Sequence, residues 1–244
     1  SCLLQPYAAA LKVAHPPRLK AIAWAKKKSD RIDARTLADL LRCNLLPECY
    51  LAPPLLRELR RVLRYRNLLV REAVRMKNKT AGLLMEVGAQ YNKQKLHGRR
   101  YFTALLENLH EVPESVRELL RLSRSQLELF QSSQKQLLAA LLEHPELQAR
   151  VARLMTIPGV GQVTALTWAL EIGEPERFGS IRQAISYCGL CSALEESGGV
   201  QKRGPLSKQR NGQLQTILIE AAKLAPRTDP HWARVYAKAR EQGQ

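Results

Sequence analysis

The sequence contains no long apolar run and no internal repeat, and its first residues are not typical of a secretory leader. No stretch reaches the roughly 18 consecutive apolar residues of a membrane-spanning helix, so we expect no membrane segment. The opening residues, Ser1 to Pro6, contain neither an initiator Met nor a basic region followed by an apolar block, which argues against a secretory signal. Repeats at solenoid periods and low-complexity segments are also absent, which disfavours a repeat array.

Cysteine is scarce and odd in number. The five residues, Cys2, Cys43, Cys49, Cys188 and Cys191, are scattered, which suits reduced thiols in the cytoplasm better than a disulfide framework. Cys188 and Cys191 form a single C-x-x-C, and without a second ligand pair this spacing is only a weak zinc signal.

Acidic residues are outnumbered by basic ones. The chain has 39 Lys and Arg against 22 Asp and Glu, a formal charge of +17. Such an excess favours a polyanionic partner, because each neutralised phosphate releases counterions. A solvated basic surface is the alternative interpretation, and charge does not separate DNA from RNA.

Residues 1–52 are predicted to have mixed structure. Leu11 to Ala14 is a short apolar run ended by His15 and two prolines, which is typical of a strand leaving a sheet. A basic helix is predicted over 18–28. Ser29 is then placed to cap a helix that runs from Asp30 to Leu41.

Two carboxylates lie on one side of that helix. Asp30 and Asp33 are three residues apart, so their side chains share a face. Near the bases Lys26, Lys27 and Lys28, they could hold a hard divalent cation against a phosphate. The alternative is that both acids complement the helix dipole and pair with nearby bases.

Residues 53–144 are predicted to form two long helices. Apolar or small residues recur at steps of four and three from Leu55 to Val87, interrupted at Arg66, and again from Val116 to Leu141. The first helix is basic and the second mildly acidic, which favours an antiparallel coiled-coil hairpin. A plain connector and a helix pair that grips RNA or DNA are both consistent with this pattern.

The predicted C-terminal domain, 145–244, opens with a helix-hairpin-helix pattern. Gly159 and Gly161 in the turn 157–161 permit close backbone approach, so N–H groups at the start of the next helix could bind a phosphate. An ordinary helix-helix turn is the alternative. Ser180 is expected to cap a helix ended by Gly189, residues 190–208 to be irregular or a short β-hairpin, and two more helices to follow over 213–225 and 231–240.

A serine bracketed by glycines precedes a basic segment. Ser197 is followed by two glycines, and no acidic residue occurs from Gly198 to Gly212. The basic residues of this segment are Lys202, Arg203, Lys208 and Arg210. The pattern indicates an oxygen nucleophile beside phosphate-binding groups, with a simple turn as the alternative.

Taken in order, these motifs resemble the insertion-sequence-110 family of DEDD transposases, understood as RNA-guided recombinases. The similarity extends over nearly the whole chain. Its segments are 28–34, 37–38, 50–54, 157–161, 187–190, 197–199, 207–211 and 220–222.

The resemblance implies a mainly helical chain in three parts. These are the C-terminal part of an RNase H-like, RuvC-resolvase-like α/β domain at 1–52, a coiled-coil connector at 53–144, and a small helix-hairpin-helix transposase domain at 145–244. It implies a Mg²⁺ site of four acids, the last two being Asp30 and Asp33. Ser197 would attack DNA phosphate to form a phosphoserine link, with the metal site of a partner subunit completing the centre.

The implied partners are DNA, a non-coding guide RNA and further copies of the chain. The nucleic-acid contacts are assigned to Gly159, Gly161, Lys202, Arg203, Lys208, Arg210, Lys26, Lys27 and Lys28. The family's first Asp and its Glu have no place before Leu11, and the family continues beyond a segment like that at Gln244. We therefore expect a fragment that binds nucleic acid without cleaving it alone. The rival hypothesis is a non-enzymatic basic protein that binds structured RNA or DNA.

Overall fold

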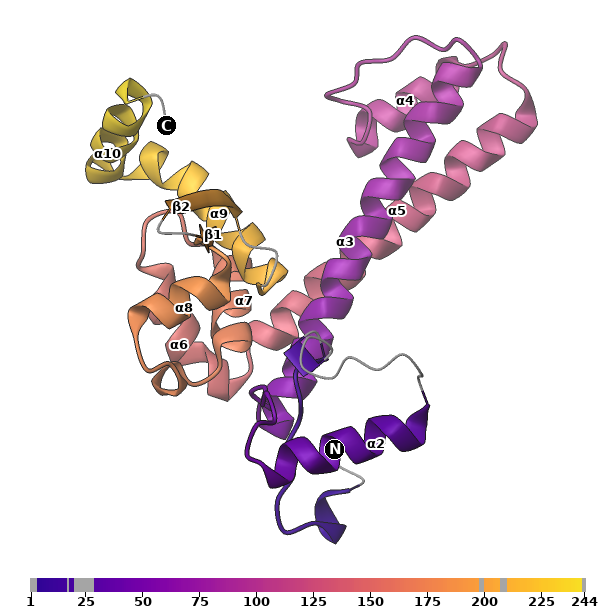
Figure 1. Cartoon of the computed structure of the whole chain (residues 1–244). Helices are drawn as coiled ribbons and strands as arrows, with labels where there is room; N and C mark the ends of the chain where they lie inside the picture. Colours follow the sequence, from indigo (N-terminus) through magenta and orange to yellow (C-terminus); the bar gives the residue numbers. More distant parts are fainter. Residues whose placement is uncertain (1–3, 17, 20–28, 198–199, 207–209, 243–244) are drawn as a thin grey trace. The chain divides into compact units, whose positions relative to one another are not determined.

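The computed structural model of the chain consists of helices and one two-stranded hairpin (Figure 1). It describes residues 4–16, 18–19, 29–197, 200–206 and 210–242. The chain forms two compact units, Ser1–Pro54 and Leu55–Gln244, which we describe in turn. The prediction of a mainly helical chain is confirmed. Among the described residues, no helix combines the length and apolar character of a membrane span.

The first unit contains the short helix η1 (Gln5–Tyr7) and α2 (Asp30–Arg42). The strand predicted at residues 11–14 is wrong in extent, because the described residues form only an isolated antiparallel bridge between Ala14 and Glu48. Prolines limit this pairing, since Pro16 and Pro47 have no N–H to extend the ladder. The basic helix predicted over 18–28 lies almost entirely outside the described residues.

An apolar hollow of about 630 Å³ lies beside α2. Leu37 and Leu41 line it from the helix, and Leu11 and Val13 line it from the extended segment. Both helix residues are exposed to solvent, so the apolar side of α2 lacks a covering layer among the described residues of this unit.

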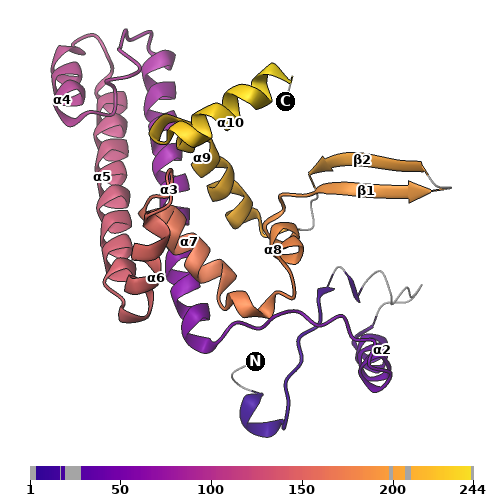
Figure 2. The same ribbon diagram turned by 90° about the vertical axis from the view of Figure 1, so that its left-hand side faces the viewer.

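The second unit begins with two long helices joined through α4 (Arg99–Asn108). They are α3 (Pro54–Glu86) and α5 (Glu114–Leu142), which lie side by side and run in opposite directions (Figures 1 and 2). Leu63 of α3 packs near Leu141 at one end, and Leu84 packs near Leu120 at the other. The predicted helices and most of their apolar seam positions are therefore confirmed, while a supercoil stays a prediction.

A polar layer interrupts the packing of α3 on α5. Gln134 of α5 donates a hydrogen bond from Nε2 to the carbonyl oxygen of Leu69, at 3.0 Å. Arg66 is half-buried, donates from Nη1 to Asn67 Oδ1 at 3.1 Å, and has its pKa lowered by burial. Both residues occupy positions where the apolar repeat is broken. Buried polar groups of this kind favour one register of two packed helices over others.

The remaining elements form a smaller helical group at one end of the pair. They are α6 (Pro145–Met155), α7 (Gln162–Ile172), η2 (Pro175–Arg177), α8 (Ile181–Cys188), β1 (Ser192–Ser197), β2 (Val200–Leu206), α9 (Gly212–Thr228) and α10 (Pro230–Glu241). Ser180 caps α8 and Gly189 ends it in the left-handed conformation, as predicted. The predicted hairpin and the last two helices are also confirmed.

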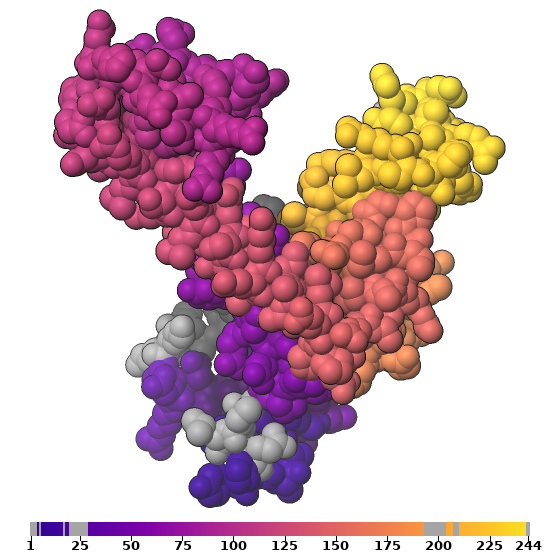
Figure 3. All heavy atoms as spheres, turned by 180° about the vertical axis from the view of Figure 1, so that it is seen from behind, coloured from indigo at the N-terminus to yellow at the C-terminus, as the bar shows by residue number. Residues whose placement is uncertain are grey.

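One apolar core joins this group to the long helices. Leu59 and Leu63 of α3 and Leu141 of α5 cluster with Val151 of α6 and Leu166 of α7. In the space-filling view of Figure 3, the spheres of α5 continue without a break into those of α6. The predicted connector and the predicted C-terminal domain therefore share buried surface.

A buried carboxylate reinforces that junction. Glu171, near the end of α7, has a side chain only 1% exposed. It accepts three hydrogen bonds from Arg64 of α3, at 2.8 to 3.2 Å, and a fourth from Asn211 Nδ2 at 2.9 Å. Arg60 of α3 donates in addition to the carbonyl oxygens of Leu170 and Glu171. The fork-shaped guanidinium suits this geometry, since it can satisfy both carboxylate oxygens at once.

We expect Arg64→Ala to lower the free energy of unfolding by about 3 kcal/mol, because it strips a buried carboxylate of its charged partner. The matched control is Arg61→Ala, an exposed residue of the same helix, for which less than about 0.5 kcal/mol is expected. Urea unfolding followed by far-ultraviolet circular dichroism measures both. Equal losses in the two variants would contradict a stabilising role for the Arg64–Glu171 pair.

Candidate strand-transfer and nucleic-acid site

Ser197 is the last residue of β1. The strand pairs antiparallel with β2, and Ser197 stands opposite Val200, so the serine lies at the turn end of the hairpin. Lys202 and Arg203 stand on β2 opposite Glu195 and Leu194. The hairpin thus brings the backbone of the predicted nucleophile next to a strand that carries two predicted phosphate ligands. Gly198, Gly199 and Lys208 lie outside the described residues.

At the base of the hairpin, hydrogen bonds connect the residues before β1 with the residues after β2. Before β1, Tyr187 accepts a backbone hydrogen bond from Asn211 at 2.9 Å, and Gly189 accepts one from Gln215 Nε2 at 2.7 Å. Asn211 follows β2 and also caps α9, its Oδ1 accepting from the N–H groups of Gln213 and Leu214. Figure 2 shows the strands extending away from these anchored ends of α8 and α9.

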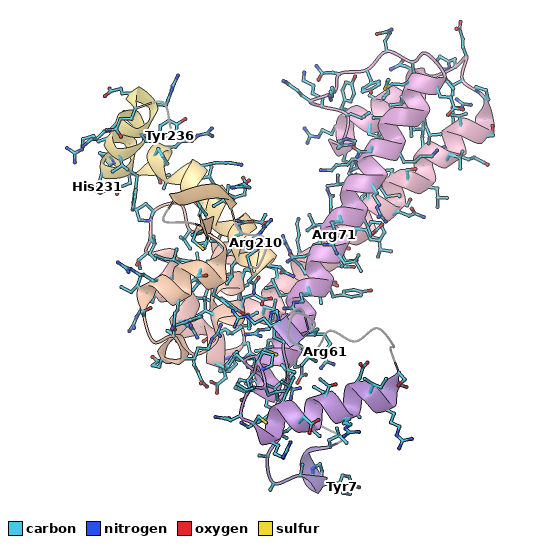
Figure 4. All side chains as sticks on the ribbon, viewed as in Figure 1. Tyr7, Arg61, Arg71, Arg210, His231 and Tyr236 are labelled. Atoms are coloured by element: carbon cyan, nitrogen blue, oxygen red, sulfur yellow. The ribbon has the colours of Figure 1, made fainter. Side chains whose placement is uncertain are left out.

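Arg210, another residue predicted to bind phosphate, also lies at the base of the hairpin. Gly189 has a φ of +74°, and a Cβ placed on it would come within 2.5 Å of the Cβ of Arg210. The missing side chain of Gly189 therefore makes room for Arg210, which is itself exposed. Figure 4 labels Arg210 just before α9. The aliphatic part of the Arg210 side chain therefore lies beside Gly189, shortly before β1 begins.

Sequence reasoning missed Glu171, Asn211 and Gln215 as parts of this site. Asn211 Nδ2 bonds to the Glu171 carboxylate, so the buried ion pair also fixes the residue that closes the hairpin. A signal for Glu171 existed, since it is the only charged residue in the apolar segment 163–172. An isolated acid in such a segment indicates a buried charge that needs a partner.

The two glycines of the 157–161 turn have different surroundings. Gly159 has a φ of +82°, and a Cβ there would come within 2.7 Å of the Ala221 carbonyl oxygen of α9. Gly161 caps α7 with a φ of −94°, is exposed, and has no atom within 4 Å of a Cβ placed on it. The Gly161 side of the turn is therefore exposed, while Gly159 packs against α9. A helix-hairpin-helix role for the turn stays a prediction.

The predicted metal ligands Asp30 and Asp33 stand in the first turn of α2. Ser29 caps the helix as predicted, its Oγ accepting from the Ile32 N–H at 3.3 Å. Both carboxylates are exposed. In the described ranges no group of three or more His, Cys, Asp or Glu side chains could hold a metal ion. Lys26, Lys27 and Lys28 lie outside those ranges.

Of the C-x-x-C cysteines, Cys188 is a core residue. It is buried with Ile172 and Leu214, and Cys191 is half-buried. Burial raises the pKa of the Cys188 thiol, and the positive charge of Arg177 opposes part of that increase. A buried, protonated thiol acts as a small apolar side chain.

Comparison with known proteins places these features in a class of transposases. A model of the IS116/IS110/IS902 transposase family matches residues 151–237, which include the hairpin, and a DEDD-type IS110 transposase model matches residues 7–88, which include Asp30 and Asp33. The two models match separate parts of the chain in sequence order. These two matches show transposase domains of the IS110/IS116/IS902 family in this chain.

Curated relatives are transposases as well. A probable family 20 transposase of Pseudomonas aeruginosa is 28% identical over 88% of this chain and 66% of its own length. The putative transposase y4qE of Sinorhizobium fredii is 28% identical over 80% of this chain and 47% of its own length. The transposase for insertion sequence element IS1328 of Yersinia enterocolitica is 27% identical over 66% of this chain and 48% of its own length. The chain spans about half to two thirds of these relatives.

We expect Gly159→Ala to lower the free energy of unfolding by about 2 kcal/mol, because an L side chain is strained at positive φ and this one would meet the α9 backbone. Gly161→Ala, two residues away in the same turn, is the control and should stay within about 0.5 kcal/mol. Thermal and urea unfolding measure the difference. Equal stability of the two variants would show that α9 does not need the glycine.

Proposed function

We propose that this chain acts in DNA transposition by cleaving and exchanging DNA strands. The support is the pair of family models, which match the acid-bearing and serine-bearing parts in sequence order. The charge of +17 supports it further, since a strand-exchange protein has to bind a phosphate polyanion. The three-part division at 53 and 145 belongs to the same proposal.

In this proposal Ser197 is the nucleophile. Its Oγ attacks a DNA phosphorus and gives up its proton, one phosphorus–oxygen bond to a sugar breaks, and the released hydroxyl takes up a proton. The enzyme keeps the other strand end as a phosphoserine, which a hydroxyl of a second strand attacks to join the strands and free the serine. Placement at the turn end of a hairpin supports this role, because such a position is reachable by a bulky duplex.

Asp30 and Asp33 are the proposed Mg²⁺ ligands. Mg²⁺ in phosphoryl-transfer sites is commonly held by one or two carboxylates plus substrate phosphate and water, so two exposed acids one helical turn apart fit it. The ion would stabilise charge on the reacting phosphate. The protein's own part is to hold both carboxylates on the first turn of α2, which the Ser29 cap fixes.

The proposed nucleic-acid contacts are Gly161, Lys202, Arg203 and Arg210, with Gly159 shaping the turn and Lys26, Lys27, Lys28 and Lys208 adding charge. Choice of target by a non-coding RNA, and assembly of several copies that share catalytic groups, are proposed by resemblance to the family. These features concern the whole assembly rather than any single contact in the chain.

We expect Ser197→Ala, made in the protein expressed from its complete gene, to abolish covalent DNA capture and strand exchange while leaving DNA affinity within about twofold. Ser192→Ala, at the other end of β1, is the matched control and should retain both activities. Denaturing gels detect the protein–DNA adduct, and fluorescence anisotropy reports binding. Adduct formation by the alanine variant would remove Ser197 from the mechanism and favour a protein that only binds nucleic acid.

A further inference from the structure

Five of the seven arginines of α3 form a row along the helix. Arg57, Arg61, Arg64, Arg71 and Arg75 follow one another at steps of four, three, seven and four residues. Residues three, four or seven apart on an α-helix share a side, so all five lie on one face of the helix. The buried residues Leu59, Leu69 and Ala73 lie on the opposite side, against α5. We call these five residues the arginine row.

The row faces solvent. Arg61, Arg64, Arg71 and Arg75 are exposed and Arg57 is half-buried. Figure 4 labels Arg61 and Arg71 where they extend from α3. Neither Arg61 nor Arg71 forms an ion pair with any acidic side chain that the structure describes, whereas Arg75 bonds to Glu72 at 3.0 Å. The row therefore holds at least two guanidinium groups whose charge the fold does not neutralise.

Two of the three acids of the neighbouring helix α5 pair with arginines of that same helix. Glu114 accepts from Arg117 and Arg121 of its own helix, and these bonds hold the pKa of the Glu114 carboxyl below its usual value. Glu128 pairs in the same way with Arg124. Although α5 is the more acidic helix, its described ion pairs form within α5, so none of them neutralises Arg61 or Arg71.

The length of the row favours a polymer over a small anion. Arg57 and Arg75 are 18 residues apart, which at about 1.5 Å per residue spans about 27 Å. That distance corresponds to about eight nucleotides of one strand at 3.4 Å each. Guanidinium groups suit this ligand because they bind phosphate oxygens in pairs. We propose that the arginine row binds the phosphodiester backbone of a nucleic acid along α3.

The row is fixed to the hairpin-bearing group through one of its own members. Arg64 belongs to the row, and its guanidinium also holds Glu171, which in turn holds Asn211 at the foot of the hairpin. A strand bound along the row therefore has a defined position relative to the Ser197 hairpin. This part of the inference rests on the proposed function, while binding along the row does not.

Salt dependence tests the proposal, with the intact chain and two exposed arginines changed together. For Arg61→Gln with Arg71→Gln we expect about tenfold weaker binding to a fluorescein-labelled 30-base-pair DNA duplex. The slope of log K against log salt should fall in magnitude by about 1.8, since each lost phosphate contact removes about 0.9. Fluorescence anisotropy over a series of NaCl concentrations gives both quantities.

The matched control is Arg99→Gln with Arg100→Gln, an equal charge change at exposed arginines of α4, outside the row. It should keep the wild-type slope to within about 0.5. Unchanged thermal unfolding of both double variants excludes misfolding. A parallel series with an RNA duplex of the same sequence identifies the bound polymer, since the row variant should lose slope with whichever duplex lies along α3.

The outcomes separate this proposal from the proposed function. An equal slope for wild type and row variant on both duplexes overturns the arginine row and leaves nucleic-acid binding to other residues. Equal loss in the row variant and the α4 control overturns it too, because net charge alone would then explain the effect. A wild-type chain that binds neither duplex would overturn the row and the strand-exchange proposal together.

Discussion

The arrangement of the second unit depends on one buried carboxylate. Glu171 ends the apolar helix α7 with a charge that is 1% exposed, and such a charge is tolerable only when donors surround it. The donors come from elements far apart in the sequence, Arg64 on α3 and Asn211 before α9. Because a guanidinium and an amide bind only in narrow geometries, the carboxylate sets how the long helices meet the smaller group.

Two glycines allow close packing elsewhere in the smaller helical group, because they have no side chain at the points of contact. Gly159 lets the turn between α6 and α7 approach the backbone of α9, and Gly189 gives space to Arg210 at the foot of the hairpin. Both glycines have positive φ, which other residues adopt only with strain. The turn thus packs against the second half of α9, at Ala221 and Ala225, while Gly189 packs against Arg210 just before the helix begins. The hairpin extends from this packed base, and among the described residues its strands β1 and β2 pair with each other alone.

The sequence predicted the elements of this site but not their contacts. Ser29, Ser180 and Gly189 mark helix ends through local hydrogen bonds, and local chemistry can be read from neighbouring residues. Arg64 and Glu171 are 107 residues apart, and no periodicity links them. For the same reason the sequence does not reveal that Gly159 packs against the backbone of α9, and its predicted contact with phosphate stays a prediction. The prediction of a strand at 11–14 was wrong because a strand needs a partner to pair with. Among the described residues this segment forms a single bridge, between Ala14 and Glu48.

The charged residues of the two long helices are arranged differently, with ion pairs within α5 and a row of arginines on α3. Glu114 and Glu128 form ion pairs with arginines of α5 itself. The packing of α3 on α5 therefore depends on apolar contacts and on the hydrogen bond from Gln134, rather than on ion pairs of these two acids with α3. The five arginines of the arginine row lie on the side of α3 away from α5, whereas Arg66 lies in the polar layer between the helices. Arg64 belongs to the arginine row and also binds Glu171. Its side chain is 53% exposed, while its guanidinium forms the ion pair with the buried carboxylate. A phosphate that approached the row would meet a cation already oriented by the protein, and binding would cost less side-chain entropy there than at a free arginine.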